Sequence, residues 1–287
     1  MRLVRVLVLV VGFLCAGLPL AWMALSSVKE RADTIAQHPK VLPFATTTPA
    51  PESLVFAPTT GSWSELAVVH AGAQASFWEH LGNSVLIGVL STLCSVVLGT
   101  ACAYGFSRFR VPGEKDWLFF VLSTRFMPPL AVVVPVLLMY RQLDLAGTHL
   151  GLVLLYTVFN LSLSVWLMKG FLDEIPRAFE EAAMVDGYTR AQAFVRVVLP
   201  EARTGMAVTA VFCLISAWNE YGFAMTLNSS GAVTVPAYFA GLAGNIEGMP
   251  WPQVAAGAIV FVAPIVVFTV LVRKHLLRGM TFGTIKQ

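Results

Sequence analysis

The chain has 287 residues, of which 57% are hydrophobic and only 12% are charged, with a formal net charge of +3. A water-soluble domain of this length needs more polar residues to cover its surface, so the composition excludes an ordinary soluble protein and indicates a chain in lipid. The net charge is small and the basic residues lie mostly between apolar runs, which argues against nucleic acid as a partner. The four cysteines lie singly in apolar runs, without the spacing of a metal site.

Six apolar segments are long enough to cross a bilayer, because a helix needs about 20 mostly apolar residues to span the hydrocarbon. Long unbroken apolar runs are typical of helices, whereas a membrane barrel would show short alternating strands. We therefore predict an all-α membrane protein with six transmembrane helices. The predicted spans are Leu3–Leu25, Asn83–Phe106, Trp117–Tyr140, Leu150–Leu172, Thr204–Leu227 and Gln253–Leu277.

The first span has a basic start, Arg2 and Arg5, that would also suit a signal peptide, and Ala24-Leu25-Ser26 is a weak cleavage site. Its apolar stretch is longer than the roughly 7–15 residues of a signal core, so we expect residues 1–25 to be retained as a helix. Residues 26–82 follow as an outer loop rich in Pro, Thr and Ala. This composition fits either a small cap or an irregular loop.

Lys and Arg residues mark the cytoplasmic side of a membrane protein. With the N-terminus inside, fourteen of the 19 basic residues lie on that side and four lie outside, while Arg125 lies within a span. We therefore predict that both termini face the cytoplasm. So does the segment 173–203, here called the charged loop, which interrupts a five-helix core at 83–277. Residues 278–287 are predicted to be a cytoplasmic tail.

The charged loop holds ten charged residues and so lies outside lipid, yet it carries helix signals. Pro176 suits a helix start, because its missing N–H would be unpaired there, and Gly187 suits a left-handed helix end. Thr189 and Gln192 match a capping box that would begin a second helix. Pro200 marks the turn into the fifth span. We predict two short helices bent at a glycine.

Two interpretations of the charged loop remain open at this point. It is either an amphipathic hairpin lying on the lipid headgroups or a pair of helices that dock in a groove of a protein partner. Its acidic residues outnumber its basic ones, and its central face is alanine rather than leucine or tryptophan. Both features favour the protein partner.

The charged loop resembles the cytoplasmic "EAA" loop of permease subunits in bacterial ATP-binding-cassette (ABC) importers. The matching residues are Glu181, Ala182, Ala183, Asp186, Gly187, Phe194, Leu199 and Pro200. The departure is Val197, where isoleucine is usual. Further stretches resemble the sugar and sugar-alcohol branch, most closely its second maltose-type permease subunit: "FAPT" at Phe56–Thr59, "WNEYGFAMTL" at Trp218–Leu227 and the tail "LLRGMTFGTIKQ". The resemblance is weakest around Leu42–Thr60.

The resemblance implies an importer in the bacterial inner membrane. Its other parts would be a homologous second permease subunit, two ATPase subunits and an extracytoplasmic solute-binding protein. Each charged loop would dock in a cleft of an ATPase, with Glu181 as polar anchor, Ala182 and Ala183 allowing close contact and Gly187 setting the bend. Gly187 alone also fits an ordinary helix stop. The tail Arg278–Gln287 would either reach the ATPases or form a basic cluster at the membrane surface.

Nucleotide binding is expected on the partner. The chain lacks G-x-x-x-x-G-K-[ST], the loop that cradles phosphates. We therefore expect ATP and Mg to lie on the ATPase, no cofactor to be bound by this chain, and the chain itself to be non-catalytic.

Polar side chains inside spans suggest function, because they are costly in lipid. Arg125 lies about 12 Å into the third span at 1.5 Å per residue, and Pro128 and Pro129 free carbonyls that can line a cavity. Alternatively, Arg125 and Glu220 pair with each other or with neighbouring helices, for a purely structural reason. Planar polar groups and aromatic rings suit a sugar, so we predict a solute pathway. Its candidate residues are Arg125, Asn160, Trp218, Asn219, Glu220 and Tyr221.

The predicted function is transport of a sugar, sugar alcohol or related polyhydroxy solute. The same machinery could carry a glycerol phosphodiester, an anionic sugar or a peptide. A secondary transporter would usually show internal repeats and paired broken helices, and neither is evident. An intramembrane hydrolase would need a Ser/His or paired-carboxylate set within the spans, whereas the five histidines lie in loops or at span ends.

Overall fold

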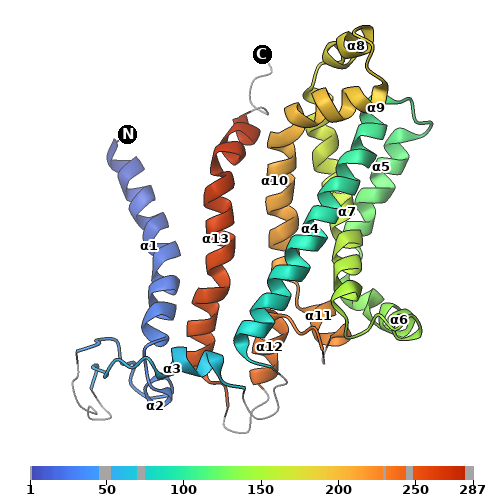
Figure 1. Ribbon diagram of the computed structural model, residues 1–287. Coiled ribbons are helices and arrows are strands. Elements are labelled where there is room, and N and C mark those ends of the chain that lie inside the picture. Colours follow the sequence, from blue (N-terminus) through green and yellow to red (C-terminus); the bar gives the residue numbers. More distant parts are fainter. Residues whose placement is uncertain (1, 45–52, 70–74, 229–230, 244–247, 282–287) are drawn as a thin grey trace. The chain divides into compact units, whose positions relative to one another are not determined.

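The computed structural model describes most of the chain. The described residues are 2–44, 53–69, 75–228, 231–243 and 248–281. Within them the regular structure is helical (Figure 1), apart from an isolated bridge between Leu42 and Val55. The chain divides into two units, residues 1–81 with 238–264 and residues 82–237 with 265–287. Each unit is described by itself.

Five helices in the described residues are long and apolar enough to cross a membrane. They are α1 (Arg2–Ser26), α4 (Phe77–Arg108), α7 (His149–Glu174), the continuous helix from Arg190 to Trp218 that ends with α10 (Leu199–Trp218), and α13 (Trp251–Thr281). A sixth candidate is the pair formed by α5 (Glu114–Ser123) and α6 (Pro129–Gln142), which is bent by 91° and is either a broken span or a re-entrant loop. The structure therefore agrees with the predicted six spans if this bent pair is counted as one span. Helices suit lipid because all their internal backbone groups are paired.

The third predicted span, Trp117–Tyr140, is not one continuous helix. After α5 the chain passes through the short helix η2 (Thr124–Phe126) and becomes extended at Met127 and Pro128, before Pro129 opens α6. A residue that precedes a proline is pushed out of the helical region, and neither proline can donate a backbone hydrogen bond. The Pro-Pro pair therefore ends one helix and starts another.

The fifth predicted span also ends earlier than expected. Its helix stops at Trp218 rather than Leu227, and after an irregular link the chain forms the short helix α11 (Gly222–Leu227). A further short helix, α12 (Val235–Leu242), lies in the segment that follows and was not predicted. The apolar sequence predicted one long helix to Leu227, whereas the structure has separate short helices after Trp218.

The first unit contains α1, α2 (Arg31–Thr34), α3 (Gly61–Ser64), η1 (Glu65–Ala67) and parts of α4, α12 and α13. Helices α2, α3 and η1 lie in the outer loop, whose residues 45–52 and 70–74 lie outside the described residues. Lys29 is only 1% exposed, and its ammonium lies 4.3 Å from the centre of the Trp22 ring and 5.2 Å from that of Phe56. Burial lowers the pKa of Lys29, and the nearby carboxylate of Asp33 opposes that effect.

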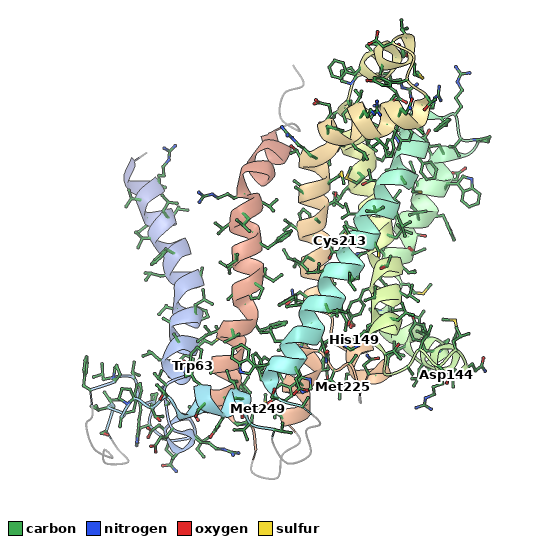
Figure 2. The ribbon with its side chains drawn as sticks, viewed as in Figure 1. Trp63, Asp144, His149, Cys213, Met225 and Met249 are labelled. Carbon is green, nitrogen blue, oxygen red and sulfur yellow. The ribbon has the colours of Figure 1, made fainter. Side chains whose placement is uncertain are left out.

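The second unit is built on α4, α7 and α10, which approach closely at small residues. A methyl group at Gly99 of α4 would meet Ser164 of α7, and one at Gly205 of α10 would meet Phe171 of α7. Small residues at such crossings are typical of helices packed in membranes. Cys213 lies on α10 and His149 at the start of α7 (Figure 2). Cys213 is fully buried, and Nε2 of His149 lies 2.7 Å from Oδ1 of Asn83 on α4.

Candidate coupling and pathway sites

The charged loop forms helices that are fixed at both ends by local signals. The first is α8 (Arg177–Val185), which begins directly after Pro176 and ends before Gly187, whose φ of 92° is left-handed. The second is α9 (Arg190–Ala193), which is held by a complete capping box between Thr189 and Gln192. The predicted bend and capping box are therefore present. In Figure 1 the loop lies at the end of the second unit opposite α6 and α11.

Pro200 predicted a turn between the loop and the fifth span, but this prediction is wrong. Instead α9 continues through the π-helical segment η3 (Phe194–Val198) into α10, which has Leu199 and Pro200 in its first turn. A proline inside a helix clashes with the carbonyl four residues earlier, here that of Arg196, and the wider π turn accommodates this clash. The loop is therefore joined to the fifth span by an uninterrupted helix.

Helix α8 has two contrasting faces. Glu180 and Ala183, three residues apart, are buried within the chain, with exposed fractions of 4% and 6%. Glu181, Ala182 and Val185 lie on the other face and are exposed, Val185 to 87%. Asp186 and Gly187 extend the exposed surface. Of the predicted contact residues, then, Ala183 faces inward while Glu181 and Ala182 face outward.

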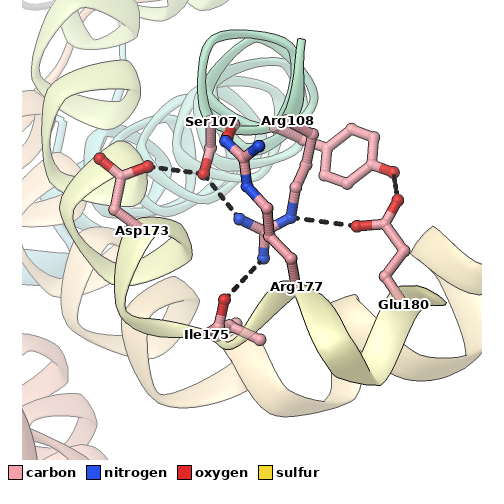
Figure 3. Close-up of polar contacts among 7 residues, drawn as sticks. Ser107, Arg108, Asp173, Ile175, Arg177 and Glu180 are labelled. Carbon is pink, nitrogen blue, oxygen red and sulfur yellow. Dashed lines mark hydrogen bonds and ion pairs between the residues drawn. The ribbon is translucent and has the colours of Figure 1, made fainter. Parts of the chain in front are cut away.

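Glu180 is held by two side chains from the end of α4. The hydroxyl of Tyr104 donates a hydrogen bond to Oε1 of Glu180, and Nε of Arg108 lies 3.0 Å from Oε2 (Figure 3). The side chains of Arg108 and Glu180 are 4% and 6% exposed, so this ion pair is almost dry. We call the three residues the Tyr104–Arg108–Glu180 cluster. The cluster could not be predicted from the sequence, because Glu180 lies more than 70 positions from both Tyr104 and Arg108.

Arg108 also ties α4 to the end of α7. Its Nη2 donates to the backbone carbonyl of Ile175, the residue that caps α7, and its Nη1 donates to Oγ of Ser107, both at 3.0 Å. Ser107 in turn donates to Asp173 at 2.6 Å and accepts a bond from Arg177 on its backbone carbonyl at 2.8 Å (Figure 3). The last turn of α4 is therefore fastened to the end of α7 and the start of α8.

The second half of the loop also meets Tyr104. The ring of Phe194 lies against that of Tyr104, with centroids 4.3 Å apart. Around this contact an apolar cluster joins α4, α7 and α10, with buried members Ala103, Tyr104, Met168, Leu172, Val198 and Ala202. Tyr104 is thus the point on α4 that both helical parts of the charged loop contact.

A second candidate site is a cavity of about 230 Å³ within the second unit. It brings together Arg125, Asn160 and Glu220 from the predicted pathway, with Tyr156 and Ser216 as polar residues that were not predicted. Aromatic walls come from Phe159 and Phe223, whose ring centroids are 4.9 Å apart. Such a combination of planar polar groups and rings can orient a small polyhydroxy molecule.

Arg125 and Glu220 do not pair with each other; each bonds to neighbouring helices instead, which the structural alternative also allowed. Among the described residues, Arg125 donates at 3.2–3.3 Å to three neutral acceptors: the carbonyl of Phe159, Oδ1 of Asn160 and Oγ of Ser216. Glu220 accepts from the Tyr156 hydroxyl at 2.6 Å and from two backbone N–H groups at the start of α11. Glu220 therefore caps α11, whereas the guanidinium of Arg125 has no carboxylate partner there.

The remaining predicted pathway residues lie elsewhere. Trp218 is 4% exposed and packs near Gly88 of α4. Asn219 is exposed and donates to the carbonyl of Ile215, and the hydroxyl of Tyr221 is directed at the sulfur of Met225. None of these three lines the cavity.

The sequence also matches a known family of transport proteins. Residues 95–281, well over half of the chain, match the family described as the binding-protein-dependent transport system inner membrane component. The chain belongs to this family. It is a membrane-spanning permease subunit of an ABC importer, as the resemblance of the charged loop predicted.

Relatives of this permease include sugar transporters. The trehalose transport system permease protein SugB of Mycobacterium tuberculosis is 35% identical over 212 residues, which cover 73% of this chain and 77% of that protein. The trehalose/maltose transport system permease protein MalG of Thermococcus litoralis is 31% identical over 214 residues, covering 73% and 76%. The diacetylchitobiose uptake system permease protein DasC of Streptomyces coelicolor is 27% identical over 278 residues, covering 96% and 94%.

A solved structure supports the fold of this permease. A chain of a bacterial ABC transporter involved in the import of the acidic polysaccharide alginate superposes with a TM-score of 0.71, covering 95% of each chain at 22% identity. At that identity the likeness concerns the fold alone.

Proposed function

We propose that this permease couples solute movement to ATP hydrolysis on a separate ATPase subunit, through the charged loop. The observation that carries the proposal is the outward face of α8. There Val185 is 87% exposed beside Glu181, Ala182 and Asp186, and Phe179 and Val195 of the same loop are also exposed, to 51% and 57%. Several exposed apolar side chains among charged ones suit a contact with another protein. Glu181 would be the polar anchor, and Ala182 would permit close approach.

The loop is mechanically suited to this task. Its first helix is capped by the left-handed Gly187, and its second by the Thr189–Gln192 box, so both ends are fixed. The second helix then continues into the fifth span. A push on the loop would therefore move α10 directly instead of being absorbed by a flexible link.

The rest of the assembly belongs to the same proposal. Two ATPase subunits would bind ATP and Mg, a homologous second permease would complete the pathway, and an extracytoplasmic binding protein would deliver the solute. Both termini and the charged loop would face the cytoplasm, since basic residues are concentrated on that side of the sequence. The family description supports an inner-membrane location in a bacterium.

The proposed solute is a sugar, a sugar alcohol or a related polyhydroxy compound. The names of the relatives support this class, and the cavity with Arg125, Asn160 and Phe159 offers suitable groups. An anionic sugar is a second candidate, because Arg125 has only neutral partners among the described residues. Melting of the cognate binding protein with neutral and acidic sugars would decide between them, since the true solute raises its melting temperature.

The coupling proposal is tested by Glu181→Ala in the reconstituted transporter. We expect normal insertion and assembly, continued ATP hydrolysis and a large loss of solute uptake per ATP. Glu174→Ala is the matched control, since it removes an exposed glutamate of the same loop outside α8. Uptake per ATP that is equal in Glu181→Ala and wild type would contradict the proposal.

A further inference from the structure

The charged loop is joined by the chain to α7 and α10, but not to α4. Among the described residues, α4 (Phe77–Arg108) reaches the loop through side chains of its last two turns, which include Tyr104, Ser107 and Arg108. These contacts give the loop a direct connection to α4, in addition to the packing of α4 on α7 and α10. The strength of these contacts therefore determines how directly α4 follows a movement of the loop.

The strongest contact is the dry ion pair between Arg108 and Glu180. A buried carboxylate needs partners for its acceptor sites, and Glu180 has one on each oxygen, the Tyr104 hydroxyl and Arg108 Nε. Charge-assisted bonds of this kind are stronger and more directional than neutral ones. Because both side chains are nearly inaccessible, water cannot readily replace either partner. The contact behaves as a stiff connection.

Adjacent glutamates on α8 face opposite ways. Consecutive helical residues are separated by about 100° around the axis, so the outward position of Glu181 leaves Glu180 facing the chain. One glutamate lies on the surface proposed for the ATPase, and the other is fastened to α4. A displacement of α8 by the ATPase would therefore pull directly on the Tyr104–Arg108–Glu180 cluster.

We propose that Glu180 is a positioning residue that transmits movement of the charged loop to α4 through Arg108 and Tyr104. The proposal rests on the coupling function above and adds a third helix to the two that the chain itself connects. Without the cluster, the loop would still dock on the ATPase and would still move α7 and α10, but its direct connection to α4 would be lost.

The decisive experiment uses the complete transporter in proteoliposomes and compares Glu180→Gln with wild type. Glu180→Gln keeps the side-chain shape but removes the charge that Arg108 and Tyr104 hold. We expect solute transported per ATP to fall about tenfold, within the range usual for coupling between two sites, while ATPase subunits still co-purify. Glu174→Gln, the same change at an exposed position, should behave as wild type.

A merely structural role is distinguished by a double-mutant cycle. If Glu180 and Arg108 act as one connection, the double variant Glu180→Gln/Arg108→Gln should transport as much per ATP as Arg108→Gln alone, which also loses the bonds to Ile175 and Ser107. Additive losses would contradict a shared connection. If Glu180→Gln fails to assemble, Tyr104→Phe decides, because it removes a single hydroxyl and keeps the ring against Phe194. An unchanged ratio in Tyr104→Phe would overturn the proposal.

The two proposals fail in different ways. If the charged loop does not couple to an ATPase at all, Glu181→Ala will also leave transport per ATP unchanged. If only the connection to α4 is wrong, Glu181→Ala will be uncoupled while Glu180→Gln stays coupled.

Discussion

The crossing of α4 and α7 offers a prediction whose size follows from the structure. The perturbation is Gly99→Ala on α4. A methyl carbon there would lie 2.2 Å from Oγ, 2.5 Å from Cβ and 3.2 Å from the backbone carbonyl carbon of Ser164 on α7. Carbon atoms prefer separations of about 3.5–4.0 Å. A new Ser164 rotamer relieves only the first contact, so the helices themselves must separate.

Overpacking of this kind costs about 1–3 kcal/mol. For a chain of this length that corresponds to a fall in Tm of about 2–5 °C. The matched control is Gly105→Ala on the same helix, where a methyl group has no neighbour within 4 Å in the described part of the chain. There the better helix propensity of alanine should leave stability unchanged or raise it by up to about 1 kcal/mol.

The assay is thermal unfolding of the purified transporter in detergent, with both variants measured beside wild type. Adding Ser164→Gly to Gly99→Ala should recover most of the loss, because it removes the Cβ and Oγ that the new methyl group meets. Equal melting temperatures for Gly99→Ala and Gly105→Ala would refute the reasoning.

Three further predictions concern single side chains. Thr189→Ala should lower the stability of the second loop helix by about 1 kcal/mol, seen as faster amide exchange there, because it breaks the bond to the Gln192 backbone. Glu220→Ala should lower the free energy of unfolding by about 0.5–2 kcal/mol and so lower the Tm. The reason is that two backbone N–H groups of α11 and the Tyr156 hydroxyl lose their acceptor. An unchanged Tm would argue against the cap. Burial lowers the pKa of Lys29 in the folded protein below 10.5. The unfolded chain therefore binds the Lys29 proton more tightly than the folded protein does. The free energy of unfolding should rise as the pH increases from the folded pKa towards 10.5. Lys29→Met should remove that part of the slope in pH-dependent unfolding, and an identical slope would contradict it.

The sequence predicted those features that depend on neighbouring residues. Helix ends in the loop follow from Gly187, Thr189 and Gln192, whose signals act within four positions. The apolar spans follow from composition, since lipid leaves the backbone few alternatives to a helix. Their interruptions were harder to place, because apolar residues lie on both sides of each break.

The clusters that depend on folding could not be predicted in the same way. Glu180 finds Tyr104 and Arg108 only when α4 and α8 meet, and the sequence contains no periodic signal for that pairing. The pathway residues show the same limit. Arg125, Asn160 and Glu220 converge on one cavity, whereas Trp218, only two residues before Glu220, packs on α4. Polarity identified candidates, but packing decided which of them meet.

The central claim is that the outward face of α8 docks on an ATPase at the cytoplasmic surface. The direct measurement introduces Val185→Cys into a permease whose native cysteines, Cys15, Cys94, Cys102 and Cys213, are replaced. Val185 is 87% exposed, so a membrane-impermeant maleimide should label this position in inside-out vesicles. We predict that labelling is lost when the cognate ATPase subunit is bound. Labelling that is unchanged by the ATPase, or that occurs only from the external side, would contradict the account.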